Sequence, residues 1–501
     1  MRRDPKLPLF VIPAKAGISS RPAVAFQREI PAFAGMTRTI KTALLALSLA
    51  ASPAFAQTIA ITGGTLALGD GSDPIQGGTV VVKDGRVVAA GRDVAIPAGA
   101  QRIDATGKWI TPGIVAGFSR IGLVEVDAVD GTNDTEANNS PFSAAIDVAP
   151  AVNPRATAIA VNRAGGVTRA IVAPATARSI FAGQGAVIDL GADMNPITRA
   201  RAFQFVELGE TGARDAGGSR ASAHVLFRNA LREARDLGRF SGIPAGPSGR
   251  RPSGANDQRD LGLEDQPDNR LLGASANRPQ DVLLTRFDAA ALVPVLQGRQ
   301  YLLVHVERAS DILQVIALKR EFPALKLVVV GAAEGWTVAR EIAASGIPVI
   351  ASALTDLPNT FEQVASTQSN VGRMKAAGVA VSIGMIDDEE ARYVKLEKQY
   401  AGNLVAIGRL PGATGLSWAQ AFAAITSAPA EAIGMGEEIG SLRPGRRADV
   451  VVWDGDPLEN ASVPQMVLID GVQQRLDNHQ TRLRDRYRTP GEGQLPKAYE
   501  H

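Results

Sequence analysis

The spacing of hydrophobic positions divides the chain into two β-rich ends and an alternating middle. Residues 58–110 and 448–474 carry short runs of β-branched residues, and Asp84-Gly85 between two such runs predicts a β-hairpin. In the middle, apolar runs and amphipathic stretches alternate in the order 301–306, 309–322, 325–331, 334–346 and 347–352. This pattern predicts parallel strands joined by helices, and the number of units favours a closed barrel over an open sheet. We expect the β-rich ends to combine in one small domain.

The N-terminal segment has the pattern of a secretory signal. After Met36, two basic residues precede a short apolar run and an Ala-Phe-Ala tripeptide that ends at Ala56. This pattern predicts a signal peptide over 36–56 and a periplasmic or secreted protein after cleavage following Ala56. The related stretches IPAKAGI (12–18) and IPAFAGM (30–36) lie 18 residues apart, which favours an upstream extension over 1–35 and a natural start at Met36.

The composition restricts the available chemistry. The chain has no cysteine and four histidines, which excludes disulfides and thiolate–metal sites and makes imidazole ligands scarce. Of its 53 Lys and Arg and 51 Asp and Glu, eight and two lie in residues 1–56, which leaves 45 basic and 49 acidic residues and a formal charge of −4. Such a balance is not typical of nucleic-acid binding, and we expect no membrane contact beyond secretion.

Composition also marks the expected segments. Residues 241–280 are rich in Pro, Gly, Asn, Asp and Arg, which predicts an exposed insertion. The expected order is an upstream extension (1–35), the signal peptide (36–56), a composite β domain (57–112 and 437–475), a barrel (113–436) that carries the insertion, and a polar tail (476–501).

Five segments occur in a fixed order: WITPGIVAGFSRIGL (109–123), NRAGGVTRAIVAP (162–174), GQGAVIDLG (183–191), VHVERASDI (304–312) and AITSAPAEAIGMGEEIGSLRPGRRADVVVWDGDPL (424–458). Together they resemble the amidohydrolase superfamily, and most of all its imidazolonepropionase-like branch. The resemblance covers nearly all of 58–475. It implies an α/β fold with a (β/α)8 TIM-like barrel and a small composite β-sandwich domain formed by both ends of the mature chain. The implied activity is metal-assisted hydrolysis of C–N bonds other than ordinary peptide bonds.

The resemblance also implies metal ligands at the C-terminal ends of the barrel strands, where a metal activates water and a carboxylate accepts its proton. The family's opening motif, P-G-[LI]-[IV]-D-x-H-x-H, has lost its aspartate and both histidines here. The substituted ligand positions are Phe118 and Arg120 in the opening motif, Gly331 on the sixth strand and Ile386 on the last strand.

These substitutions argue against the divalent, zinc-like ion that the family would imply, and we assign no metal ligand. The fixed positive charge of Arg120 would repel a divalent cation. The chain also has no lysine between Lys108 and Lys319, so the carboxylated lysine that bridges two metals in some family members is excluded.

Three residues remain as catalytic candidates. His305 matches the family's strand-five histidine and is interpreted as a ligand, a general base or a hydrogen-bonded remnant. Glu307 shares its strand face by two-residue alternation, and Asp387 follows the substituted last-strand position. A one-residue slip could present the Asp387 carboxylate, although such a slip turns a side chain to the other face of a strand. Glu334, three residues after Gly331, is expected to complement a helix N-terminus.

The sequence leaves three functions open. The first is a weakly active or non-catalytic family member, acting as a partner subunit of an active paralogue. The second is a periplasmic amidohydrolase acting on cyclic amides or small peptide-like substrates. The third is a structural or interaction protein with the barrel as scaffold. The expected partners are a small molecule or small peptide, and a second copy or an active paralogue in an oligomer.

Overall fold

The computed structural model describes residues 58–240, 283–386 and 393–488, all within one compact unit that spans Ala56–His501. The predicted extension and signal peptide, the insertion, Asp387 and the end of the predicted tail lie outside the described residues. Among the helices of the described ranges, none is long and apolar enough to cross a membrane.

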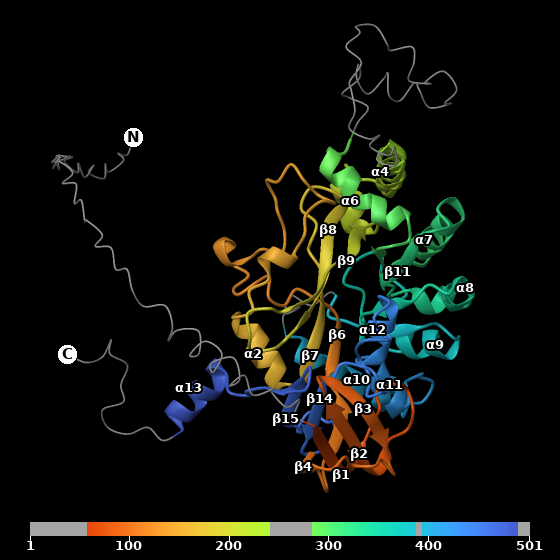
Figure 1. The fold of residues 1–501 in the computed structure, drawn as a ribbon. Coiled ribbons are helices and arrows are strands. Elements are labelled where there is room, and N and C mark those ends of the chain that lie inside the picture. The colour runs from red at the N-terminus through yellow and green to blue at the C-terminus, as the bar shows by residue number, and fades with distance from the viewer. Residues whose placement is uncertain (1–57, 241–282, 387–392, 489–501) are drawn as a thin grey trace, which may run out of the picture. The chain divides into compact units, whose positions relative to one another are not determined.

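The described elements alternate between single strands and helices over residues 301–383 (Figure 1), whereas several strands follow one another near both ends of the described chain. The strands are β1 (Ile59–Leu66), β2 (Ile75–Lys83), β3 (Arg86–Gly91), β4 (Gln101–Asp104), β5 (Trp109–Pro112), β6 (Ile114–Ser119), β7 (Val167–Val172), β8 (Phe181–Asp189), β9 (Ile197–Glu207), β10 (Tyr301–Val306), β11 (Lys326–Gly331), β12 (Val349–Ala351), β13 (Val381–Ile383), β14 (Val450–Trp453), β15 (Pro464–Ile469) and β16 (Val472–Gln473). The α-helices are α2 (Thr157–Ala164), α3 (Glu210–Asp215), α4 (Arg220–Phe240), α6 (Arg286–Leu296), α7 (Ala309–Glu321), α8 (Ala339–Ser345), α9 (Asn370–Ala376), α10 (Glu397–Ile407), α11 (Trp418–Ala423), α12 (Ser427–Ala432) and α13 (His479–Tyr487).

One eight-stranded sheet combines strands from both ends of the described chain. Its order is β16-β15-β14-β5-β1-β2-β3, and β4 pairs with β1. The predicted hairpin is confirmed, because β2 and β3 are antiparallel and Asp84 and Gly85 between them have φ values of 53° and 71°. Positive φ at both central positions is typical of the two-residue turns that match strand twist. The sandwich form expected for this domain stays a prediction, since the pairing describes a single sheet.

The second sheet forms a nearly closed barrel in the order β13-β12-β11-β10-β9-β8-β7-β6. Its edges meet directly where the Met385 amide donates to the Phe118 carbonyl oxygen at 3.1 Å. Elsewhere residues 424 and 425 fill the gap, because the carbonyl oxygen of Ala424 accepts from Ile383 and that of Ile425 accepts from Val115. Together with the surrounding helices, this sheet is an α/β TIM-like barrel.

The β7–β8–β9 region differs from the regular strand–helix repeat that the sequence predicts. Strand β8 is antiparallel to both neighbours, whereas the other pairs in this sheet are parallel. The connections over residues 173–180 and 190–196 are too short for the crossover helix that parallel strands need. Three strands of the barrel wall therefore form a meander.

The barrel interior is packed with apolar side chains. Two-residue alternation directs Phe203 and Phe205 of β9 and Leu303 of β10 into one buried cluster with Phe118. The rings of Phe118 and Phe205 are 5.3 Å apart between centroids, at an interplanar angle of 59°. Phe118 is 1% exposed, so an aromatic ring fills the position at which the family resemblance places a metal ligand.

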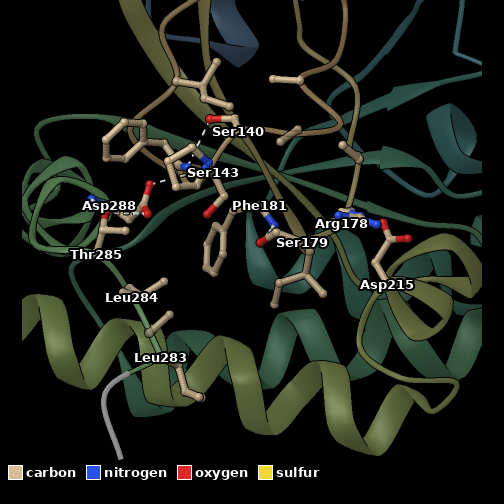
Figure 2. Close-up of a pocket in the computed structure, with 18 of the residues that line it drawn as sticks. Ser140, Ser143, Arg178, Ser179, Phe181, Asp215, Leu283, Leu284, Thr285 and Asp288 are labelled. Atoms are coloured by element: carbon tan, nitrogen blue, oxygen red, sulfur yellow. Dashed lines mark hydrogen bonds between the residues drawn. The ribbon is translucent and has the colours of Figure 1, made fainter. Parts of the chain in front are cut away.

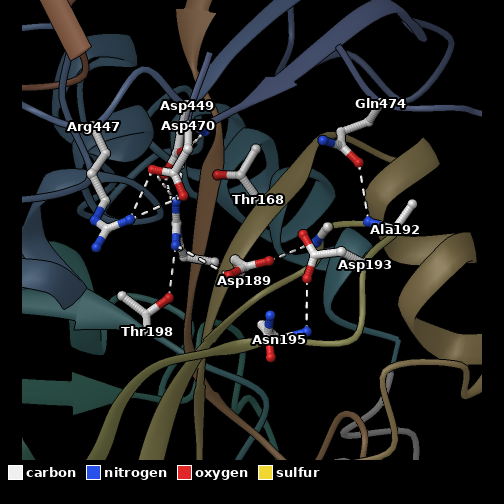
Figure 3. A network of polar contacts seen from close by, with 12 residues as sticks. Thr168, Asp189, Ala192, Asp193, Asn195, Thr198, Arg447, Asp449, Asp470 and Gln474 are labelled. Atoms are coloured by element: carbon white, nitrogen blue, oxygen red, sulfur yellow. Dashed lines mark hydrogen bonds and ion pairs between the residues drawn. The ribbon is translucent and has the colours of Figure 1, made fainter. Parts of the chain in front are cut away.

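A buried arginine joins the barrel to the small sheet, and its acidic partners Asp189, Asp449 and Asp470 are labelled in Figure 3. The Arg169 side chain, on β7, is fully buried and donates to Asp449 from Nε at 2.7 Å and from Nη2 at 3.0 Å. Its Nη2 also lies 2.9 Å from Asp470, and its Nη1 lies 3.6 Å from Asp189. Burial raises the pKa of Asp189 to about 6, although the Arg169 charge partly opposes the shift. These contacts connect strand β7 with residues flanking β14 and β15.

Candidate functional site

A layer of charged side chains lies on the interior face of the barrel, beyond the apolar cluster. Glu207 ends β9 two residues after Phe205, and His305 on β10 lies two residues after Leu303. Glu307 continues the β10 alternation just past the strand end. Because the C-terminal ends of parallel strands form the mouth of such a barrel, this layer is the candidate functional site.

His305 is held between two glutamates. Its Nδ1 lies 2.7 Å from Oε2 of Glu207, and its Nε2 lies 3.0 Å from Oε1 of Glu307. The three side chains are 13%, 10% and 2% exposed, respectively. Oε2 of Glu307 accepts a hydrogen bond of 2.6 Å from the backbone amide of Ala333. The structure therefore brings together the predicted residues His305 and Glu307, and adds Glu207.

The two carboxylates determine the protonation state of His305. Burial lowers the pKa of the imidazole, but the charges and hydrogen bonds of Glu207 and Glu307 outweigh it and raise this pKa well above its usual range. A protonated imidazole donates from both nitrogens and has no lone pair for a metal or for a proton of water. The geometry supports the interpretation of His305 as a hydrogen-bonded remnant more than the ligand or general-base interpretations.

The charge on His305 gives a pH-dependent contribution to stability. Since its folded-state pKa lies above the ordinary value of 6.5, this contribution is complete below pH 6.5 and is lost as the pH rises through the folded-state pKa. We therefore expect the difference in unfolding free energy between the wild type and His305→Gln to shrink as the pH rises above 6.5. Denaturant unfolding across this pH range measures the difference.

His224 supplies the control for this titration. Burial and the neighbouring Arg228 lower its pKa, so its contribution is complete above pH 6.5 and is lost as the pH falls through the folded-state pKa. The difference between the wild type and His224→Gln should consequently change with pH in the opposite direction. If the difference in unfolding free energy between the wild type and His305→Gln grew with rising pH, His305 would not be a protonated imidazole held by the two glutamates.

Gly331 makes room for the Glu307 carboxylate. A Cβ atom at this position would lie 2.4 Å from Oε1 and 2.9 Å from Oε2 of Glu307, and the backbone has a φ of +93°. No side chain fits that contact without displacing the carboxylate, and L-residues rarely adopt this φ. A histidine at this substituted position is therefore incompatible with the observed place of Glu307.

Arg120 brings a second cation to the layer, one residue after the end of β6. Its Nε is buried and has no hydrogen-bond partner within the described part of the chain. Burial lowers the pKa of the guanidinium, and the carboxylates of Glu207, Glu136 and Asp127 oppose this shift. Arginine nonetheless stays charged in proteins. With His305 protonated, Arg120 and His305 balance the charges of Glu207 and Glu307.

The remaining predicted positions have separate surroundings. The Glu334 carboxylate accepts from the amide of Ala309, the first residue of α7, and from the amide of Ala365, both at 3.0 Å. It therefore caps a neighbouring helix instead of entering the charged layer. Ile386 packs partly buried against the interior cluster, as an apolar replacement for a ligand would. Asp387 lies outside the described residues.

The residues at the mouth do not fit a hydrolytic metal centre. A catalytic zinc site typically needs three protein ligands with an open fourth position. Phe118 and Ile386 offer hydrocarbon, Gly331 offers no side chain, and His305 is engaged on both nitrogens. In the described ranges, no group of three or more His, Cys, Asp or Glu side chains could hold a metal ion.

Glu207 is not among the residues predicted from the sequence, although the alternation of Phe203, Phe205 and Glu207 is typical of side chains on one interior face of β9. Arg169 and its aspartates were missed as well, because no local pattern indicates which distant carboxylates a buried arginine will meet.

Comparisons with known proteins agree with this fold. A model of the amidohydrolase family matches residues 318–473. The chain is 25% identical over 407 residues to the amidohydrolase tasK of Hapsidospora irregularis, covering 76% of this chain and 38% of that protein, so it spans well under half of that relative. It resembles the crystal structure of an amidohydrolase from Thermotoga maritima MSB8 with a TM-score of 0.67 and 23% identity, over 83% of this chain and all of the other. Residues 318–473 thus match the amidohydrolase family, and the described fold is similar to that of a solved amidohydrolase.

Proposed function

We propose that this protein is an amidohydrolase-superfamily member whose barrel mouth is non-catalytic or only weakly active, and that it serves as a partner subunit of an active paralogue. The observation that carries the proposal is the clamp of His305 between Glu207 and Glu307. Both imidazole nitrogens and both Glu307 oxygens are engaged within it. A hydrolase needs a group that can accept a proton from water, and this clamp offers none in the imidazole.

Electrostatics support the same conclusion. The layer contains two fixed or stabilised cations, Arg120 and protonated His305, and their charges offset the attraction that Glu207 and Glu307 would exert on a divalent ion. Without a metal, positioned acid–base groups accelerate a reaction by only about 10²–10⁴-fold, which is weak support for amide hydrolysis.

Elemental analysis of the protein purified from its native periplasm tests the proposal. We expect far less than one zinc, iron or manganese ion per chain, and no gain in hydrolysis of dipeptides or cyclic amides when these metals are added. The variant His305→Gln should hydrolyse the same panel no more slowly than the wild type. Stoichiometric metal that is lost in His305→Gln would overturn the proposal. The same preparation reports whether the chain begins after Ala56 and whether another protein elutes with it, as export and a partner role require.

The second candidate is an ordinary amidohydrolase that acts on cyclic amides or small peptide-like molecules. The match of residues 318–473 to the amidohydrolase family and the similarity to a protein named as an amidohydrolase favour it. On this alternative, Glu207 or Glu307 would act as the base and Asp387 would complete the site. Metal-dependent turnover of any compound in the panel would establish this candidate in place of the first.

A further inference from the structure

A separate cavity lies among the segments that follow β6 and β7 and the helices α3, α4 and α6 (Figure 2). Its volume is about 310 Å³, which is at the lower end of the range for small-molecule sites. Its lining includes neither Arg120 nor any member of the Glu207–His305–Glu307 clamp. An inference about this cavity therefore does not depend on the proposed function of the mouth.

The cavity contains a carboxylate that lacks a full set of partners. Asp215, the last residue of α3, has a side chain that is 9% exposed. Its Oδ2 is buried without a hydrogen-bond partner in the described part of the chain, and its Oδ1 lies 3.9 Å from Arg214. Burial raises the pKa of this carboxyl group, partly opposed by Thr176 and Arg214. A buried acceptor of this kind is costly unless a ligand or water donates to it.

A cation lies at the same end of the cavity. Arg178 lines it and is exposed, so its guanidinium is accessible to a bound molecule. Figure 2 shows the Arg178 and Asp215 side chains on the same side of the pocket. An arginine fork matches a carboxylate, whereas an aspartate matches an ammonium group. The pair is thus suited to a molecule that carries both charges close together.

The rest of the lining is mainly apolar, or consists of polar groups that already have hydrogen-bond partners within the protein. Phe142, Phe181, Leu226 and Leu284 supply hydrocarbon surface. Asp288, the other acid of the cavity, accepts from the amides of two loop residues and from the Thr285 hydroxyl, so it fixes the wall instead of offering a free charge. The site therefore combines one zwitterionic end with one apolar end.

We propose that this cavity binds an α-amino acid with an apolar side chain, with Asp215 accepting from its ammonium group, Arg178 donating to its carboxylate, and Phe142 and Phe181 contacting its side chain. Neither charged residue is a member of the Glu207–His305–Glu307 clamp. The two charged residues restrict the choice of ligand more than the cavity volume does, because a compound that lacks either charge leaves Asp215 or Arg178 without a partner.

Calorimetric titration of the full-length protein with L-phenylalanine, L-leucine and L-methionine tests this site. We expect binding of at least one of them, and at least about tenfold weaker binding of the matching amino-acid amide and of the matching acid without an amino group. The substitutions Asp215→Asn and Arg178→Gln should each weaken the binding of the amino acid by a similar factor. Arg320→Gln, an exposed change on α7 outside the cavity, should bind like the wild type.

Two results would overturn the proposal. One is the absence of binding by all three amino acids up to about 10 mM, a concentration that detects even weak sites. The other is equal binding of the amino acid by the wild type, Asp215→Asn and Arg178→Gln. Circular dichroism of each variant distinguishes loss of the site from loss of the fold.

Discussion

Replacing Gly331 by alanine is expected to lower the free energy of unfolding by about 2–4 kcal/mol. Two costs combine at this position. The backbone φ of +93° is strained for any residue with a side chain, and the new methyl group would lie within 3 Å of both oxygens of Glu307. Because Glu307 is 2% exposed and bonded to His305 and the Ala333 amide, its carboxylate cannot move without losing those partners.

Gly346 is the matched control for Gly331. It has a φ of +67° at the C-terminal end of α8, and a Cβ atom there would meet nothing within 4 Å. Gly346→Ala therefore carries the backbone strain alone, at a cost of about 1 kcal/mol. Denaturant unfolding compares the two variants, and the imidazole resonances of His305 report whether its pKa falls in Gly331→Ala. Equal stability of the two variants would mean that Glu307 is not confined by the glycine.

Replacing Arg169 by methionine is expected to cost about 3–5 kcal/mol, the penalty for removing one member of a buried ion pair. The change would leave Asp449 without its two hydrogen bonds from the guanidinium and would remove the cation beside Asp470 and Asp189. Denaturant unfolding measures the loss. The double variant Arg169→Met with Asp449→Asn should recover part of it, because it removes a buried negative charge.

Arg443 is the control for Arg169. It pairs with Asp70 at 2.9 Å, but its side chain is 55% exposed, so Arg443→Met should cost less than about 1 kcal/mol. An Arg169→Met protein as stable as Arg443→Met would show that the buried network contributes little. Failure of the double variant to recover any stability would show that packing of the arginine stem, and not its charge, is what matters.

The parts of the fold that follow from local pattern were predictable. The strand–helix–strand order from β10 to β12 follows from apolar runs alternating with amphipathic stretches, and the turn at Asp84 and Gly85 follows from its residue types. The antiparallel β8 was not predictable in this way. The hydrophobic pattern of a buried strand is the same whether it pairs in parallel or antiparallel. Only the short connections on each side of β8 indicate that this strand runs antiparallel to its neighbours.

The site was only partly predictable, because its chemistry depends on distances that the sequence does not contain. Motif positions identified His305 and Glu307 as neighbours on one strand face. The sequence does not indicate that Glu207 on β9 would meet the other side of the imidazole, and this contact decides its charge. The role of Gly331 was also not predictable. A substituted ligand position indicates that a metal ligand has been lost, but not which side chain now occupies the space.

The packing of Phe118 against Phe205 has a consequence for engineering. Phe118→His alone would place an imidazole among hydrocarbon side chains, where its polar atoms would lose hydration without gaining a counterpart. Introducing a histidine at Gly331 as well would push against Glu307. Each single substitution toward a zinc site is therefore expected to lower the stability of the fold before any catalytic activity is gained. Redesign of this scaffold for hydrolysis thus requires several simultaneous substitutions on neighbouring strands.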